Sequence, residues 1–418
     1  KACLWPSLVR LSVHRRGGNE DKVGRVSMRA VIALLLAFCM TSPAFAYDLQ
    51  DTVDAPDAGL LSFELNDPYD IRIQPFGYIR IGYEAVENDD RFDFIGRNDG
   101  FILDNARVGT KVTVADQLRF VFSVEAASDV EAGNNTPIGE IDVRLRDGFI
   151  RWDPLWFVGI QAGQFKAPFA AEELRSTANL LFVSRAVGQE GVLPGRGFEE
   201  VGVGVDRQLG AMISSPKPLP IWDAFAGSYY LMVANGNGDN ELLNDNDNVA
   251  VYGRGELHYD DFATIGGAFL VNDRTEGELP NLTDDEDTGF AADLTLTPFG
   301  FDLMFQFVQL ETEFDTVAAA VDRTQRAYHV QIGYTFDTPY LTLTPGYRYA
   351  VLDPYADIDG DTAGLDLDAF KVDYHTLGIR LGHLDLPMSL LVNYTFTDEK
   401  EPRELDNDRL QILAQVEF

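Results

Sequence analysis

Hydrophobic and polar residues alternate with a period of two along most of the chain after residue 75. In the closing stretch "LQILAQVEF", Leu410, Ile412 and Phe418 fall on one face of an extended chain, while Gln411 and Glu417 fall on the other. Similar stretches, rich in Phe, Tyr, Val, Ile and Thr, predict sixteen strands. Their predicted ranges are 75–86, 101–115, 117–127, 142–153, 155–165, 198–214, 222–235, 248–260, 262–272, 288–297, 300–313, 323–337, 339–352, 370–383, 386–397 and 408–418.

The links between these strands alternate in length. Short links such as Asp153–Pro154 and Asp337–Pro339 follow every second strand, and long polar links such as 128–141 and 273–287 follow the others. Barrels of outer membranes have short periplasmic turns and long outer loops. The pattern therefore predicts an all-β fold, a 16-stranded antiparallel transmembrane β-barrel over residues 75–418, in which the last strand pairs with the first.

The N-terminal part has the features of a secretory signal. Met28 and Arg29 precede an apolar run, and the small residues Ala44 and Ala46 precede Tyr47. The run of eleven apolar residues (30–40) is shorter than the roughly 20 that a transmembrane helix needs. The predicted divisions are a non-native upstream extension (1–27), a signal peptide (28–46), a short periplasmic segment (47–74) and the barrel domain (75–418).

Composition narrows the possible partners. The chain has 67 acidic and 33 basic residues and a formal net charge of -34, which argues against nucleic acid. Both cysteines, Cys3 and Cys39, precede the predicted cleavage site, so we expect neither a disulfide nor a thiolate metal site in the mature protein. The acidic residues gather in the long links. They suit divalent cations that bridge to lipopolysaccharide, or they are simply solvated.

One long link, residues 166–197, is more apolar and more basic than the others. It contains "AAEELRSTANLLFV", in which Leu174, Leu180 and Leu181 fall near one face of a helix. A loop that folds back into the barrel and narrows it would have this character; a loop that packs against a neighbouring subunit would also have it. The basic residues predicted at the constriction are Lys166, Arg175, Arg185 and Arg196.

This link also carries a family resemblance. The segment Val158–Ala186, "VGIQAGQFKAPFAAEELRSTANLLFVSRA", resembles the phosphate-selective porin O and P family, where a strand ending in Gly-x-Phe-Lys-x-Pro-Phe leads into the third loop. The preceding "RLRDGFIRW" is similar to the strand before this motif. The resemblance implies a homotrimeric porin in the outer membrane of a Gram-negative bacterium, with the third loop at its constriction. It also implies passage of small hydrophilic solutes, among them small anions such as phosphate.

The C-terminus carries a second resemblance. A last strand that ends in Phe418 resembles the signal that outer-membrane barrels present to the barrel assembly machinery.

Strand parity predicts which charged residues face the lumen. Where apolar residues point to lipid, the alternate positions carry basic residues, and such residues are the expected lining of anion pores. The predicted pore-lining residues are Arg80, Arg107, Lys111, Arg119, Arg151, Arg254, Arg348, Arg380 and Arg409. Glu84, Glu125, Asp147 and Glu256 share these faces, so cross-wall salt bridges that brace the barrel are the alternative.

The sequence leaves several other functions to consider. For an enzyme, His258, His329, His375 and His383 lie in no Ser or Cys motif, so we expect no catalytic residues and no cofactor. For calcium binding, "DIDGDTAGLDLD" (357–368) lacks the EF-hand glycine, although a loose surface site stays open. Two alternatives remain. One is a plugged structural barrel, and the other is a general or cation-preferring porin whose ion selectivity is determined by its acidic loops.

Overall fold

The computed structural model describes residues 62–65, 70–133, 136–241, 243–278, 281–314, 322–358 and 366–418. The predicted extension (1–27), the predicted signal peptide (28–46) and most of the predicted periplasmic segment (47–74) lie outside these residues, so that division stays a prediction. Most of the acidic stretch 357–368 lies outside them as well. Within the described ranges, no helix is both long and apolar enough to cross a membrane.

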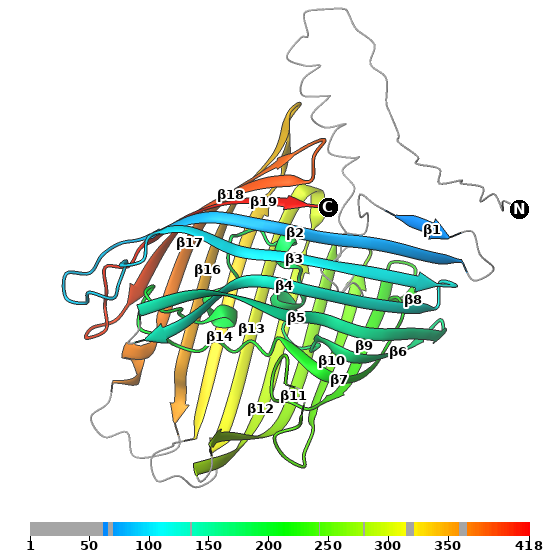
Figure 1. Ribbon diagram of the computed structural model, residues 1–418, viewed down its shortest axis with the longest axis horizontal. Helices are drawn as coiled ribbons and strands as arrows, with labels where there is room; N and C mark the ends of the chain where they lie inside the picture. Colours follow the sequence, from blue (N-terminus) through cyan, green and yellow to red (C-terminus); the bar gives the residue numbers. More distant parts are fainter. Residues whose placement is uncertain are drawn as a thin grey trace, which may run out of the picture. The chain divides into compact units, whose positions relative to one another are not determined.

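Sixteen antiparallel strands form one closed ring, which confirms the predicted fold class (Figure 1). The ring closes between the first and last strands, where Arg80 lies opposite Gln415. The strands are β2 (Ile71–Val86), β3 (Gly100–Val114), β4 (Leu118–Gly133), β5 (Thr136–Leu155), β6 (Val158–Lys166), β7 (Arg207–Ser214), β9 (Phe225–Ala234), β10 (Ala250–Tyr259), β11 (Ala263–Glu278), β12 (Asn281–Leu296), β13 (Phe301–Phe314), β14 (Arg323–Tyr334), β16 (Leu341–Ile358), β17 (Val372–His383), β18 (Met388–Glu399) and β19 (Arg409–Glu417). Three short strands flank the ring: β1 (Phe63–Leu65) on β2, β8 (Leu219–Trp222) on β9 and β15 (Phe336–Asp337) on β16.

The two faces of the wall differ in polarity, as the period of two predicts. In β19, Ile412 and Val416 are exposed, while Gln411 and Gln415 are buried. Large exposed apolar side chains recur at alternate positions around the ring, for example in β2, β4, β11, β14 and β17. Because the barrel is closed, the exposed apolar face is its outside and the polar face its inside. An apolar outer band with a polar interior is the arrangement of barrels that lie in a lipid bilayer.

Two predicted long loops are wrong. β4 and β5 pair as far as Gly133 and Thr136, and β11 and β12 pair as far as Glu278 and Asn281, so most of 128–141 and 273–287 is hairpin. The apolar alternation stops in these stretches, but the backbone ladder continues. Beyond the bilayer a strand has no lipid-facing side, so its pairing does not require that alternation.

The predicted strand 198–214 is too long. β7 begins at Arg207, and residues 198–206 belong to the preceding loop. A Cβ on Gly202 would lie only 2.5 Å from the carbonyl oxygen of Gln189, so this stretch packs closely on another part of the same loop. That packing replaces the ladder that the sequence pattern suggested.

The short links are tight and rich in aromatic residues at their ends. Between β3 and β4, Ala115 and Asp116 have φ of 52° and 54°, as in the type I′ turns that join paired strands in hairpins. Exposed aromatic side chains stand at other short links, including Trp156, Phe299 and Tyr340. Aromatic residues at this level anchor barrels at the boundary between membrane and water.

Candidate functional site

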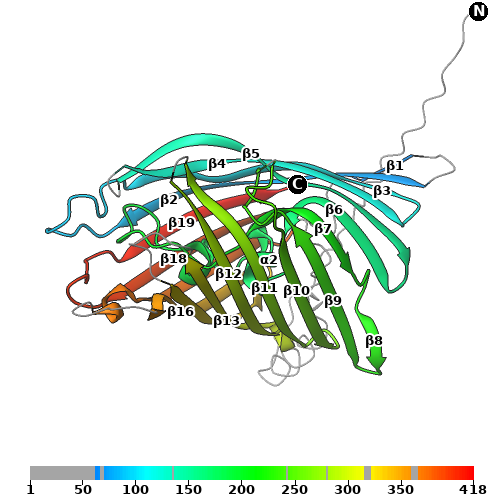
Figure 2. The same ribbon diagram turned by 90° about the horizontal axis from the view of Figure 1, so that it is seen from below.

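The long connection between β6 and β7, residues 167–206, is called loop three here. It contains two short α-helices, α2 (Ala171–Leu174) and α3 (Val187–Glu190), and one 3-10 turn, η1 (Thr177–Asn179). The helical stretch expected over 170–183 is therefore broken. Ser176 interrupts it, because it adopts an extended conformation and its side chain accepts a hydrogen bond from the N–H of Ala178. In Figure 2, α2 lies among the strands of the barrel.

Arginines of the wall hold loop three by its backbone. Their guanidinium groups donate hydrogen bonds to main-chain carbonyls of the loop, and the strands that carry them, β2, β10, β16 and β17, are spread around the ring. The bonds run from Arg80 to Val183 (2.6 Å), from Arg254 to Phe169 (2.9 Å), from Arg348 to Ser184 (2.9 Å) and from Arg380 to Leu180 (2.9 Å). Loop three therefore packs along the inner face of the barrel.

The loop is also held by apolar packing. The side chains of Leu174, Leu180 and Leu181 are buried, as are Phe165 at the end of β6 and Phe169 at the start of the loop. Leu181 lies over Gly333 and Gly346, where a Cβ would come within 2.7 and 3.0 Å of its side chain. The apolar character of this segment in the sequence thus corresponds to contacts inside the barrel.

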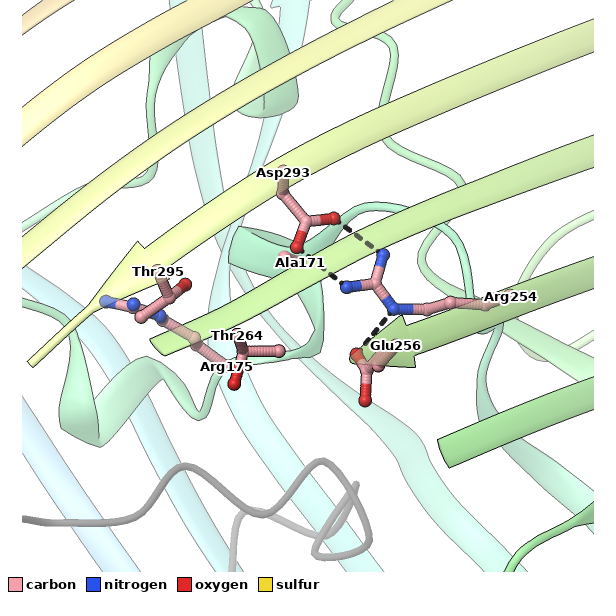
Figure 3. A pocket seen from close by; sticks show the side chains of 7 residues that line it. All are labelled: Ala171, Arg175, Arg254, Glu256, Thr264, Asp293 and Thr295. Carbon is pink, nitrogen blue, oxygen red and sulfur yellow. Dashed lines mark hydrogen bonds and ion pairs between the residues drawn. The ribbon is translucent and has the colours of Figure 1, made fainter. Parts of the chain in front are cut away.

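The anchoring arginines also form buried ion pairs. Arg254 is bonded to Asp293 at 2.8 Å and to Glu256 at 2.7 Å, and Figure 3 shows its guanidinium between these two carboxylates. A cavity of about 20 Å³ lies beside them; its lining comprises Ala171, Arg175, Arg254, Glu256, Thr264, Asp293 and Thr295. It is barely large enough for one water molecule. This region is consequently a packed structural joint between loop three and the wall.

A second charged network joins β3, β4, β5 and β7. Arg107 lies 3.1 Å from Glu125, and Arg207 lies 3.0 Å from Asp147. Arg146 adds a bond of 3.0 Å to Glu125 and bonds of 3.2 Å to Asp206 and to Asp239. Acidic and basic groups alternate through the network, so that each buried charge has a partner of opposite sign.

Three basic residues near the short-turn end of the wall lie in a different environment. Lys111, Arg119 and Arg151, called the basic patch, share the inner face of β3, β4 and β5. Arg119 lies directly opposite Arg151 in the ladder, and Lys111 is diagonal to Arg119. Arg151 is buried and bonds Asp153 at 2.9 Å and Ser214 at 3.0 Å, whereas Lys111 and Arg119 are half-buried. Like charges directly opposite each other repel, and a bound anion would relieve that repulsion.

The remaining predicted site residues lie as follows. Lys166 is the last residue of β6 rather than part of the loop, and its ammonium donates to the carbonyl of Arg175 at 2.9 Å. Arg175 lies 3.4 Å from Asp302. Arg185 donates to the same carbonyl of Arg175 at 2.7 Å. Two further basic groups meet at Glu84, with Arg196 at 2.8 Å and Arg409 at 3.9 Å.

Several charged residues of this region were missed in the sequence. Arg146 occupies a β-bulge, since Ser123 pairs with Asp147 while the next residue pairs with Leu145, and the extra residue breaks the period of two. Arg207 begins a strand whose start was misplaced. Counting residues along the strand does not reveal the bulge. The run "RLRD" around Arg146 nevertheless places a charge on the face that should be apolar, and this indicates an irregularity in the strand.

The histidines and carboxylates of the inner wall form neither a metal-binding group nor a triad in the part of the chain that the structure describes. In the described ranges, no group of three or more His, Cys, Asp or Glu side chains could hold a metal ion. His258 lies 2.8 Å from the hydroxyl of Ser228, but its other ring nitrogen contacts the hydroxyl of Thr264 at 3.1 Å. A catalytic triad needs a group on that second nitrogen that stabilises a positive imidazole, usually a carboxylate. The carboxylate of Glu256 lies 3.7 Å from the ring nitrogen that contacts Ser228, whereas the carboxylate of a triad binds the other nitrogen. This contact therefore has the geometry of a hydrogen-bonded inner-wall histidine.

Residues 76–216, about a third of the chain, match the family described as Phosphate-selective porin O and P. This match confirms the predicted resemblance over that region. The family match over this third of the chain and the closed barrel of sixteen strands indicate a channel protein of the outer membrane. A search of curated protein sequences gave no match.

Solved structures with the same fold share little sequence with this chain. An anion-selective porin from Comamonas acidovorans is 15% identical, covers 84% of this chain and 100% of its own, and gives a TM-score of 0.54. The Salmonella typhi OmpF complex with daunomycin is 13% identical, with coverage of 86% and 100% and a TM-score of 0.53. The trimer form of OmpT from Vibrio cholerae is 10% identical, with coverage of 83% and 99% and a TM-score of 0.52. These likenesses concern the fold.

Proposed function

We propose that this porin lets small hydrophilic solutes diffuse passively across the outer membrane and that it prefers anions, phosphate among them. The observation that carries the preference is the basic patch. Lys111, Arg119 and Arg151 bring three basic side chains to one inner face, where Arg151 is also paired with Asp153. Clustered Arg and Lys side chains attract anions into a pore and bind each one weakly enough to release it.

Loop three is proposed as the constriction. A barrel of sixteen strands encloses an aqueous channel unless an inserted element narrows it, and loop three lies on the inner face. Among its basic residues, Arg185 and Arg196 are half-buried, while Arg175 and Lys166 at the end of β6 are buried. We therefore assign Arg185 and Arg196 the larger part in selecting solutes, and Lys166 and Arg175 the part of holding the loop in place.

The family match and one structural neighbour support the finer points. The matched family is described as phosphate-selective, and the neighbour from Comamonas acidovorans is described as anion-selective. The Vibrio cholerae neighbour is described as a trimer form, which supports a homotrimer here. The same proposal includes two further partners. Divalent cations would bridge the acidic outer surface to lipopolysaccharide, and the assembly machinery would recognise Phe418.

The test is the reversal potential of the purified porin in a planar lipid bilayer under a KCl gradient, repeated with phosphate added. The proposal predicts the sign of chloride selectivity and a current that falls as phosphate occupies the channel. Cation selectivity would contradict the anion preference and leave a general porin ruled by its acidic loops. No conductance at all would contradict the proposal and favour a plugged barrel.

A further inference from the structure

Two adjacent glutamates on α2 have different partners. One carboxylate oxygen of Glu172 accepts a hydrogen bond from the N–H of Ala186 at 3.0 Å, and the other lies 3.3 Å from the guanidinium of Arg348. The carboxylate oxygens of Glu173 accept hydrogen bonds from the backbone N–H groups of Val205 at 3.2 Å and of Asp206 at 2.5 Å. Both side chains are almost fully buried. Glu172 therefore sits beside a positive charge, whereas neutral N–H groups bind Glu173.

Glu173 joins the two ends of loop three. It belongs to α2 near the start of the loop, and Val205 and Asp206 immediately precede β7. The two ends also meet through the N–H of Ala167, which donates to the carbonyl of Asp206 at 3.0 Å. A Cβ on Gly204 would lie 3.1 Å from a carboxylate oxygen of Glu173, so this neck of the loop is tightly packed. The side chain of Glu173 thus closes the neck.

Burial and a neighbouring acid act against the ionised form of Glu173. That acid is Asp206, which is itself bonded to Arg146 at 3.2 Å and to Arg207 at 3.0 Å. Burial, and then the negative charge of Asp206, raise the pKa of Glu173 to about 7, although the two backbone N–H bonds and the guanidinium of Arg185 act in the opposite direction. The other groups that face this site are Arg185 from loop three, Lys166 from the end of β6 through Asp206, and Tyr252 from β10.

We infer that Glu173 is a positioning residue of loop three, whose protonation sets how firmly the neck of the loop is docked. This inference rests on the proposed role of the loop as the constriction. A neutral Glu173 gives up one of its two backbone N–H bonds but adds no charge beside Asp206. An ionised Glu173 keeps both bonds but places a second buried negative charge at that point, and the cost of burying that charge is the larger of the two effects.

The direction of the pH effect follows from linkage. The pKa of Glu173 is higher in the docked loop than the ordinary value of an exposed glutamate, so protons favour docking. Glu173 contributes fully to docking when the pH is below the ordinary pKa of an exposed glutamate. This contribution is lost as the pH rises through about 7. Between pH 6 and pH 8 the docking equilibrium should weaken about tenfold.

The experiment is hydrogen exchange of the peptide that contains Val205 and Asp206, measured by mass spectrometry on the folded porin at pH 6 and pH 8 and corrected for intrinsic exchange. Protection in the wild type should fall about tenfold between the two values. Glu173→Gln cannot titrate, so its protection should be equal at both. Constant protection in the wild type, or a fall that persists in Glu173→Gln, would overturn the inference.

Two further variants separate titration from simple damage to the loop. Glu199→Gln removes an exposed glutamate of the same loop and should behave like the wild type. Glu172→Gln loses the ion pair with Arg348, so it should lower protection at both values while keeping the tenfold fall. If Glu172→Gln abolished the fall instead, the assignment to Glu173 would be wrong.

The same porin in a planar bilayer gives a second readout. Conductance of the wild type should change with a midpoint near pH 7, and that transition should be missing in Glu173→Gln. A porin without anion preference at fixed pH would contradict the proposed function and would leave the exchange result unaffected. The two proposals can therefore fail independently.

Discussion

Two parts of the inner wall use the same kind of residue for different purposes. On β2, β10, β16 and β17, four arginines donate to backbone carbonyls of loop three; Arg80, Arg254 and Arg348 are buried and Arg380 is half-buried. On β3 and β4, Lys111 and Arg119 are half-buried and share their face with Arg151. Strand parity treats all of these residues alike, because it reports only the face on which a side chain lies.

The difference comes from the acceptors within reach. Loop three brings a row of main-chain carbonyls into the barrel, and a buried carbonyl needs a donor. An arginine near that row is held by its bonds to the carbonyls, so its N–H groups are less available to a passing ion. The side chain of a basic residue farther from the row, such as Lys111, can approach a solute more closely. The number of inward arginines is therefore a poor measure of anion selectivity, and their position relative to loop three is a better one.

The largest effect is expected from Arg348→Ala. The substitution leaves the carboxylate of Glu172 and the carbonyls of Ser184 and Arg185 without this donor. An unpaired buried charge of this kind costs about 3–5 kcal/mol, enough to release loop three from the wall. Limited trypsin digestion of the folded barrel should then cut the loop after Arg185 or Arg196.

The control for this variant is Arg144→Ala. Arg144 lies 2.6 Å from Asp142, and both side chains are nearly half exposed. Its removal should leave the digestion pattern unchanged. Equal resistance of Arg348→Ala and the wild type would show that the arginine does not anchor the loop and would break the comparison.

A smaller effect is expected from Arg119→Gln. One positive charge of the basic patch is removed, while Arg151 keeps its bonds to Asp153 and Ser214. A single charge in a wet channel contributes about 1 kcal/mol to binding an ion close to it. The phosphate concentration that halves the KCl current should therefore rise about fivefold. The measurement is a phosphate titration in planar bilayers, and an unchanged half-blocking concentration would remove Arg119 from the anion path.

The smallest effect is expected from Lys400→Ala at an outer link. Lys400 lies 3.0 Å from Asp368, and both side chains are more than half exposed. Surface pairs of this kind contribute about 0.2–1 kcal/mol, because water and salt screen them. Thermal unfolding of the barrel and the phosphate titration should both match the wild type. A marked loss of stability would mean that outer charges matter more than the inner wall does.

The fold could be predicted from the sequence because each strand faces lipid on one side and a polar interior on the other. That contrast produces a period of two in the sequence, as in β19. From this period the number of strands and the closure of the ring could be predicted. Strand ends outside the bilayer lack the contrast, so the sequence pattern predicts loops where β4 and β11 extend. The predicted start of β7 is wrong for the opposite reason. Apolar residues that pack inside loop three alternate with polar ones, as residues of a strand do.

The candidate site could be predicted only in part. The inner position of Arg80 or Arg348 followed from parity, but their bonds to Val183 and Ser184 join residues far apart in the chain. Parity also failed at the bulge that contains Arg146. The contrast between Glu172 and Glu173 was hidden, because two adjacent glutamates look alike until their partners are known.

The most direct test of the central claim is the reversal potential under a KCl gradient, compared between the wild type and the double variant Lys111→Gln/Arg119→Gln. Both residues are half-buried, so the barrel should fold with either pair of side chains. The account predicts chloride selectivity in the wild type and a shift toward cation selectivity in the double variant. An unchanged reversal potential in the double variant, or cation selectivity in the wild type, would contradict it.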